Sequence, residues 1–254
     1  IVFGDWSSDV CSSDLQVLQY GAELREVEGT YDLAFDLSLR YSAETGVLSR
    51  NTAYNPLTIE GKKTVSFELV RDLAASLRRP IGDPAGAFVA PDHVFVPTGD
   101  GVILSGVYRG FEDLIRLGRI AKMPVVWACQ AAGSSAIARA LDSGGFGPPV
   151  GADTAADSIS VDVPRNGAHA LSKLRAYGGR AVTAADPEIF AAQRELASKA
   201  GLFVEPSSAA AWAGFLAAKK DLDPAQTVVV LLTGSGLKDI AGAMKGLGIG
   251  GSAS

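Results

Sequence analysis

Two glycine turns are the residues of this chain best suited to chemistry. Thr98-Gly99-Asp100-Gly101 follows the apolar run "HVFVP", and Thr233-Gly234-Ser235-Gly236 follows "VVVLL". A turn of this kind between a buried strand and a helix aims backbone N–H groups and the positive end of the helix dipole at one point, which suits an anion such as phosphate. An ordinary strand–helix turn uses the same residues, so the turns alone leave both interpretations open.

The spacing of the first turn excludes the two common nucleotide motifs. The glycines at Gly99, Gly101 and Gly106 read G-x-G-x-x-x-x-G, whereas a dinucleotide fingerprint needs its third glycine two positions earlier and an acidic residue at the end of the next strand. That strand ends at Gln130. A P-loop needs Lys and Ser or Thr after the last glycine, and Val107-Tyr108 stands there instead.

The elements that would position these turns alternate between strands and helices. Period-two and continuous apolar runs predict strands, and apolar residues three or four apart predict helices. Expected strands span residues 22–29, 93–98, 125–131, 180–184 and 227–233, and expected helices span residues 31–46, 59–77, 134–141 and 186–200. A further helix should follow the first glycine turn, with Leu104, Val107, Phe111 and Leu114 on one face. The helix over residues 186–200 should have Asp186 as its N-cap and Pro187 as its first helical residue. The proline- and glycine-rich residues 78–92 form the best internal boundary.

This order predicts an α/β fold, with a mostly parallel sheet and helices on both faces. The carboxyl ends of parallel strands line one crevice. Both glycine turns should therefore open toward the same ligand.

Composition limits the partners. The chain has 254 residues, a net charge of -5 and a pI near 5.1, which argues against nucleic acid as a main partner. Its longest apolar runs are too short to cross a membrane. Two cysteines, Cys11 and Cys129, cannot form a disulfide framework and suit a reducing cytoplasm. With only His93 and His169, no metal site and no Ser-His or Cys-His pair is expected.

Five segments carry a resemblance to a known family. In order they are "NTAYNPLTIEGKKT", "VPTGDGVILSGVYRGFEDL", "ADSISVDVPRNG", "GLFVEPSSAAAWAG" and "LLTGSGLKD". They resemble the second half of threonine synthase, a pyridoxal-phosphate enzyme of the tryptophan-synthase-β fold type (fold type II). The resemblance runs from about Leu15 to about Gly248. It implies a pyridoxal 5'-phosphate cofactor and a small amino-acid substrate.

The resemblance also implies roles for individual residues. Gly99, Asp100, Gly101 and Val102 match the turn that holds the cofactor phosphate through backbone N–H groups. The carboxylate of Asp100 should then point outward or cap its own turn, because it would repel a phosphate. A larger side chain at Gly101 should block the approach of the phosphate to the backbone. Thr233 matches the hydroxyl residue that meets the pyridine nitrogen, and a hydroxyl does not enforce protonation of that nitrogen.

Asn51 and Thr52 match residues that hold the phosphate of O-phospho-L-homoserine in the family. Several relatives carry an arginine just before the Glu-Gly pair, where this chain has Leu57, Thr58 and Ile59 and therefore no such charge. The hydroxyl of Thr58 is a poorer partner for a phosphate than a guanidinium. A nearby lysine, Lys62 or Lys63, could supply the missing charge. The asparagines next to the proline are equally typical of a simple turn, so both interpretations of Asn51 stay open.

The family attaches its cofactor to a lysine in a Ser-x-Lys-Asp context, and this motif does not occur in the chain. Of its nine lysines, Lys220 and Lys238 precede aspartate, but neither stands in that context. No catalytic residue is therefore assigned within the chain, which is expected to be inactive alone. Residues 1–14, with their repeated Ser-Ser-Asp, look like a non-native leader and are set outside the fold.

The rest divides into residues 15–55, a remnant of the family's small domain, and residues 56–254, the large cofactor-binding domain. The resemblance thus implies a fold-type-II enzyme truncated at its N-terminus, homodimeric when full length. Two alternatives stay open. One is a relative with another substrate, such as a threonine or serine dehydratase or a cysteate synthase. The other is a non-catalytic α/β binding module.

Overall fold

A four-stranded parallel sheet forms the centre of the molecule. The computed structural model describes residues 2–5, 17–28, 31–77 and 88–249. The strands are β3 (His93–Pro97), β4 (Val125–Ala131), β5 (Arg180–Ala184) and β6 (Val228–Val230), in the order β5-β4-β3-β6. Every pair is parallel, with Phe95 opposite both Trp127 and Val230. The parallel α/β sheet expected from the sequence is confirmed.

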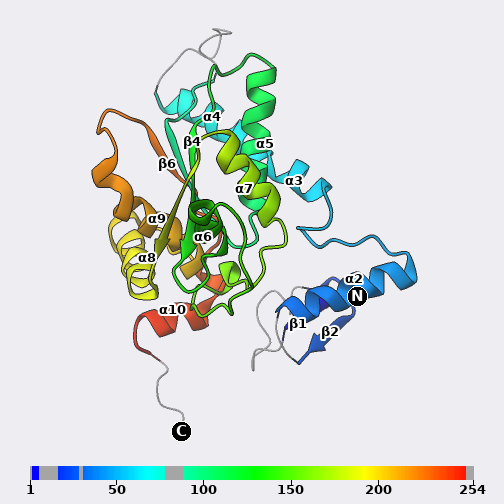
Figure 1. Cartoon of the computed structure of the whole chain (residues 1–254). Coiled ribbons are helices and arrows are strands. Elements are labelled where there is room, and N and C mark those ends of the chain that lie inside the picture. Colours follow the sequence, from blue (N-terminus) through cyan, green and yellow to red (C-terminus); the bar gives the residue numbers. More distant parts are fainter. Residues whose placement is uncertain (1, 6–16, 29–30, 78–87, 250–254) are drawn as a thin grey trace.

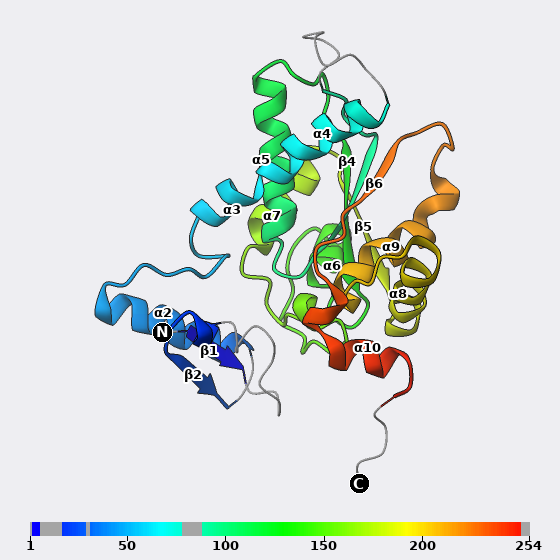
Figure 2. The same cartoon turned by 180° about the vertical axis from the view of Figure 1, so that it is seen from behind.

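Helices cover both faces of this sheet (Figures 1 and 2). One face carries α4 (Thr64–Ser76), α5 (Val102–Arg116), α6 (Ala136–Ser143) and α7 (Gly167–Ala176), and the other carries α8 (Asp186–Ala200) and α9 (Pro206–Ala218). Alternate strand residues serve the two layers: Val94 and Val96 pack with α5, whereas Phe95 packs with α9. Apolar side chains on both sides of each strand explain why these strands read as continuous apolar runs.

Helix α9 is buried on nearly every side. Nine of its 13 residues are buried, most of them alanine, glycine or serine. The helix packs closely on the sheet: a β-carbon added at Gly214 would lie 2.9 Å from the sulfur of Cys129 in β4. Small residues allow this close helix–sheet packing, as the alanine-rich sequence indicates.

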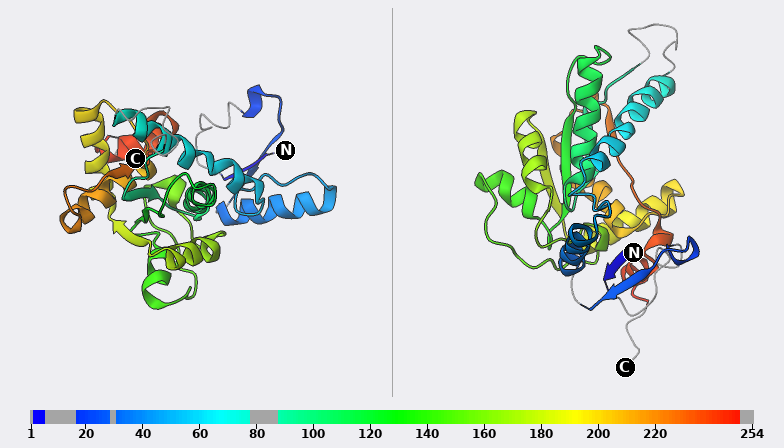
Figure 3. Two further views of the ribbon diagram at one scale, coloured as in Figure 1. Left: turned by 90° about the horizontal axis from the view of Figure 1, so that it is seen from above. Right: turned by 90° about the vertical axis from the view of Figure 1, so that its right-hand side faces the viewer.

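A smaller unit precedes the main sheet. Strand β1 (Val2–Asp5) pairs in parallel with β2 (Leu24–Val27), and helix α2 (Tyr31–Thr45) contacts β1. Figure 3 shows this unit beside the main sheet and not within it. The strand Val2–Asp5 corrects the expectation that the first 14 residues lie wholly outside the fold; whether they are native is untested. Helix α2 ends at Thr45, and Gly46 follows it with a φ of 73°, which suits glycine.

Two other expectations need correction. The helix expected over residues 59–77 is two helices, α3 (Leu57–Lys62) and α4, because the turn at Lys63 tightens: the N–H of Ser66 donates to the carbonyl of Lys63, three residues back. Helix α8 begins at Asp186 and its N-cap is Ala185, one residue earlier than expected. The boundary proposed at residues 78–92 lies mostly outside the described residues.

Short elements complete the chain. They are the 3₁₀ turns η1 (Asp157–Ile159), η2 (Lys219–Asp221) and η3 (Gly236–Lys238), and helix α10 (Ile240–Gly246). Among the described helices, none combines the length and the apolar character needed to span a bilayer.

Candidate functional site

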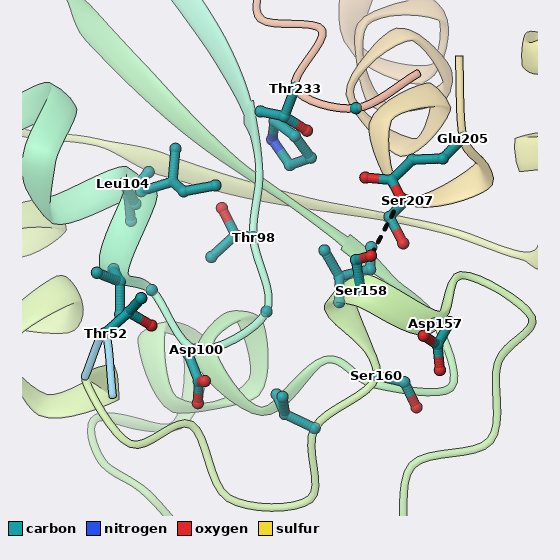
Figure 4. Close-up of a pocket in the computed structure, with 18 of the residues that line it drawn as sticks. Thr52, Thr98, Asp100, Leu104, Asp157, Ser158, Ser160, Glu205, Ser207 and Thr233 are labelled. Carbon is teal, nitrogen blue, oxygen red and sulfur yellow. Dashed lines mark hydrogen bonds between the residues drawn. The ribbon is translucent and has the colours of Figure 1, made fainter. Parts of the chain in front are cut away.

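Both glycine turns open into one cavity of roughly 630 Å³. It lies at the carboxyl ends of β3 and β6, as the parallel sheet predicts. Figure 4 shows Asp100 and Thr233 contributing to its wall from different segments. Among the cavity-lining residues are Thr52, Lys62, Gly99, Asp100, Gly101, Val102, Ser158, Glu205, Ser207, Thr233 and Lys238.

The first turn ends at the N-terminus of α5. Gly101 is the N-cap, with a left-handed φ of 83°, and no side chain caps this helix. Within the part of the chain that the structure describes, the N–H groups of Val102, Ile103 and Leu104 have no hydrogen-bond partner. Three unpaired N–H groups and the positive end of a 15-residue helix make this wall of the cavity a site for an anion.

The glycines of this turn are needed for packing as well as for conformation. A β-carbon at Gly99 would lie 2.9 Å from the Cα of Ile159, and one at Gly101 would lie 2.7 Å from the β-carbon of Ala170. The reason expected for Gly101 is therefore wrong in part. A side chain there would point into the α5–α7 interface, so its first effect is a clash with α7 together with backbone strain.

Asp100 does not cap its own turn. Its Oδ1 accepts a hydrogen bond of 2.8 Å from the backbone N–H of Arg165, and its carbonyl accepts one from the N–H of Asn166. The carboxylate thus anchors the loop that precedes α7. Burial raises the pKa of Asp100, and the hydrogen bond from Arg165 opposes that shift.

Two polar residues that the sequence analysis did not select, Gln130 and Asn166, hold the turn in place. The amide of Gln130 donates to the carbonyl of Thr98, and its oxygen accepts from the N–H of Ala138 in α6. Asn166 donates to the carbonyl of Gly101 and to the hydroxyl of Ser105. The only signal for these contacts was the resemblance of the segment "ADSISVDVPRNG", which contains Asn166.

The second turn places Thr233 on the cavity wall. Its N–H donates to the hydroxyl of Ser208 in α9, and its own hydroxyl has no partner among the described residues. Beside it, Glu205 is buried and accepts from Lys238 and from Ser158, each at 3.1 Å. Lys238 is thus held in an ion pair at this end of the cavity.

The two residues expected to bind substrate differ in their position relative to the cavity. Thr52 lines the cavity, but Asn51 does not. The amide of Asn51 donates to the hydroxyl of Ser38 in α2, and its carbonyl accepts from the N–H groups of Tyr54 and Asn55. In this structure Asn51 shapes the turn before α3.

Comparison with known proteins places this geometry in a family. The family model for "Pyridoxal-phosphate dependent enzyme" matches residues 6–234. The chain belongs to the pyridoxal-phosphate dependent enzyme family. The match begins within the first 14 residues that were set aside as a leader.

Curated relatives in this family confirm the resemblance to threonine synthase. The chain is 33% identical to "Threonine synthase" of Methanosarcina acetivorans over 231 residues, which is 88% of this chain and 53% of the relative. It is 32% identical to "Threonine synthase" of Mycobacterium tuberculosis over 233 residues, 91% of this chain and 59% of the relative. The chain therefore spans about half the length of the curated relatives it matches.

Solved structures in this family share the fold. A fungal L-serine ammonia-lyase from Rhizomucor miehei superimposes with a TM-score of 0.72 at 21% identity, covering 97% of this chain and 73% of that one. Threonine deaminase isoform 2 of Solanum lycopersicum gives a TM-score of 0.75 at 19% identity, covering 98% and 66%. These superpositions establish the fold-type-II architecture.

The cavity of this family member fits a pyridoxal 5'-phosphate cofactor. The unpaired N–H groups at the start of α5 suit its phosphate, and the unpartnered hydroxyl of Thr233 suits its ring nitrogen. Among the described residues no group of three or more His, Cys, Asp or Glu side chains could hold a metal ion.

Proposed function

We propose that this chain is the cofactor-binding portion of a threonine synthase, which converts O-phospho-L-homoserine and water to L-threonine and phosphate. The observation that carries the proposal is the pairing of two features in one cavity: the uncapped N-terminus of α5 and the hydroxyl of Thr233. The 30–33% identity to threonine synthases supports the choice of reaction within the family.

Each residue has a stated task in this proposal. The backbone N–H groups from Gly99 to Val102 bind the cofactor phosphate, and the left-handed Gly101 sets their direction. The hydroxyl of Thr233 accompanies the ring nitrogen without forcing a proton onto it. When bound, pyridoxal phosphate supplies an electron sink for the substrate. A hydroxyl partner keeps that sink weaker than a carboxylate would, which favours elimination and replacement over transamination.

The substrate phosphate is assigned to the wall that carries Thr52. Thr58 is not assigned to this group, because its hydroxyl already donates to the carbonyls of Thr52 and Asn55. Asn51 stays in the proposal as the residue that fixes the turn. We further propose that the chain alone is inactive, because it lacks a lysine in the Ser-x-Lys-Asp context, and that the longer enzyme is a cytoplasmic homodimer.

Binding of non-reactive analogues tests the cofactor assignment directly. Pyridoxine 5'-phosphate, which has no aldehyde, should bind to the chain, and pyridoxine without its phosphate should bind far more weakly. Fluorescence titration of both compounds gives the comparison. Equal affinity for the two, or none for either, would refute the cofactor proposal and favour an unrelated binding module.

The missing arginine favours a second candidate, a related enzyme such as a dehydratase or a cysteate synthase. Turnover of O-phosphohomoserine, phosphoserine and threonine by the longer protein separates these reactions. Preferred turnover of O-phosphohomoserine supports the threonine synthase proposal. Preferred turnover of phosphoserine or threonine supports the second candidate in its place.

A further inference from the structure

Lys62 is a partly buried cation on the cavity wall, and no counter-ion accompanies it among the residues that the structure describes. It closes helix α3 and lines the cavity together with Thr52. No hydrogen bond or ion pair joins its amine to any residue in the described ranges, whereas the other lining lysine, Lys238, is paired with Glu205. An unpaired charge at a partly buried position has a cost that a bound anion would offset.

Two carboxylates close to Lys62 in the cavity wall or in the sequence, Asp32 and Glu60, are paired with other cations. Asp32, which also lines the cavity, pairs with Arg165 at 2.7 Å. Glu60 pairs with Lys63 and Arg109, and Lys63 also reaches Asp113 at 2.9 Å. The two neighbouring lysines of α3 therefore differ: Lys63 belongs to a salt-bridge network, and Lys62 is left facing the cavity.

A second cation strengthens the positive potential here. Burial lowers the pKa of Lys62, and the charge of Arg50 lowers it further. Arg50 is exposed and, within the described part of the chain, likewise has no ion-pair partner. Two like charges kept near each other, with a threonine hydroxyl on the same wall, make a match for a phosphoryl group, which offers several acceptor oxygens and a double charge.

Close packing against α5 fixes the backbone and the β-carbon of Lys62. A β-carbon at Gly106 of α5 would lie 2.6 Å from the β-carbon of Lys62, so only glycine at position 106 lets α3 approach this closely. Gly106 thus fixes the Cα and Cβ of Lys62 against α5, in the second turn after the phosphate-binding N-terminus.

We propose that Lys62, assisted by Arg50, is the residue that binds the phosphoryl group of the substrate and sets the preference of this enzyme for a phosphorylated amino acid. This inference rests on the proposed function, because it places substrate in the cavity that holds the cofactor. It gives the site a positive charge that the residues just before Glu60, Leu57, Thr58 and Ile59, do not supply.

The test uses the chain saturated with pyridoxine 5'-phosphate, which occupies the cofactor site, and inorganic phosphate as the probe of the second site. Calorimetric titration should show phosphate binding to the wild type, with acetate binding more weakly. Lys62→Met should weaken phosphate binding by about tenfold or more, and Arg50→Gln by a smaller factor. Lys62→Arg should restore most of the affinity, because the charge is kept.

Lys63→Met is the matched control: it should lower the melting temperature by breaking its salt bridges, with phosphate affinity unchanged. A second measurement covers the case in which Lys62→Met fails to fold. Phosphate should protect Lys62, and not Lys63, from acetylation of the wild-type chain, as mapped by mass spectrometry.

The outcomes separate the two proposals. If pyridoxine 5'-phosphate does not bind to the wild type, the proposed function fails. If it binds, but phosphate affinity is the same in Lys62→Met or Lys62 is not protected, the assignment of Lys62 is overturned. Acetate binding as tight as phosphate would overturn the preference for a phosphoryl group.

Discussion

Asp100 places a carboxylate in the turn that we propose binds the cofactor phosphate. Its carboxylate is partly buried near the proposed phosphate site, and its hydrogen bond from Arg165 can equally be made to an amide oxygen. Asp100→Asn should therefore raise the affinity for pyridoxine 5'-phosphate several-fold, on the order of 1 kcal/mol, because a like charge is removed.

This effect has a predictable pH dependence. Because burial raises the pKa of Asp100, the carboxyl takes up its proton at a higher pH than an ordinary aspartate. The wild type and Asp100→Asn should therefore differ most near neutral pH and converge as the pH falls through that raised pKa. Fluorescence titrations of both proteins across this pH range give the ratio of their affinities for pyridoxine 5'-phosphate. Protonation of the ligand phosphate affects both affinities equally and cancels in this ratio. If the ratio of the two affinities does not change with pH, the charge of Asp100 does not affect phosphate binding.

Gly101 combines two constraints that substitutions can separate. Gly101→Ala introduces strain at a φ of 83° and a contact of 2.7 Å with Ala170, so the free energy of unfolding should fall by about 2–4 kcal/mol. Gly118→Ala is the control, since its φ is 64° but no atom lies within 4 Å, and it should lose only about 1 kcal/mol. Urea denaturation compares them, and equal losses would show that the α7 contact is unimportant.

Some residues of the candidate site could be predicted from the sequence, and others could not. The turn glycines and Thr233 could be selected from the sequence because strand, turn and helix signals are local. Gln130 and Asn166 could not be selected on physical grounds, because they contact the turn from 32 and 65 residues away. Nor did the sequence decide between Lys62 and Lys63, since that choice depends on which carboxylates lie nearby.

At the scale of elements, the contact of α3 and α4 with α5 depends on two glycines on one face of α5. Gly106 meets Lys62, and Gly110 meets the carbonyl of Lys63 and the β-carbon of Ser66. The sequence predicted one helix over residues 59–77 because its apolar periodicity continues through Lys63. The tightened turn at Lys63 comes from this tertiary contact, which no local pattern encodes.

Substitution of glycine by alanine should have opposite effects at two helical positions. Gly110→Ala forces α4 away from α5 and should lower the free energy of unfolding by about 1–3 kcal/mol. Gly61→Ala in α3 has no atom within 4 Å and should raise it by about 0.5–1 kcal/mol, because alanine favours the helix. Chemical denaturation tests both. A stabilising Gly110→Ala would contradict the close packing.

At the scale of the whole molecule, the unit formed by β1, β2 and α2 leaves apolar surface uncovered. Leu33 is 44% exposed, Leu18 is 46% exposed, and Val27 and Leu37 are only partly buried. The sequence predicts that residues 15–55 are the remnant of a small domain. Exposed apolar side chains of this kind promote self-association. Leu18→Lys with Leu33→Lys should reduce aggregation in light scattering without changing the affinity for pyridoxine 5'-phosphate.

The lysines lead to another prediction for the whole chain. Lys238 is held by Glu205 and Ser158, and Lys62 is assigned to the substrate. Treatment with pyridoxal phosphate and borohydride should therefore label none of the nine lysines stoichiometrically. Peptide mapping by mass spectrometry provides the readout. Stoichiometric label on one lysine would contradict the proposal that this chain alone is inactive for want of its cofactor-linked lysine.

The burial of α9 has a consequence for motion. A helix surrounded by the sheet and by α8 can exchange its amide hydrogens only when the main sheet opens, so its slowest amides should report global unfolding. Amides of β2 and α2, in the smaller unit beside the sheet, should exchange orders of magnitude faster through local opening. Hydrogen exchange followed by mass spectrometry would then resolve two cooperative units in one chain, with the glycine turn at residues 98–101 belonging to the slower unit.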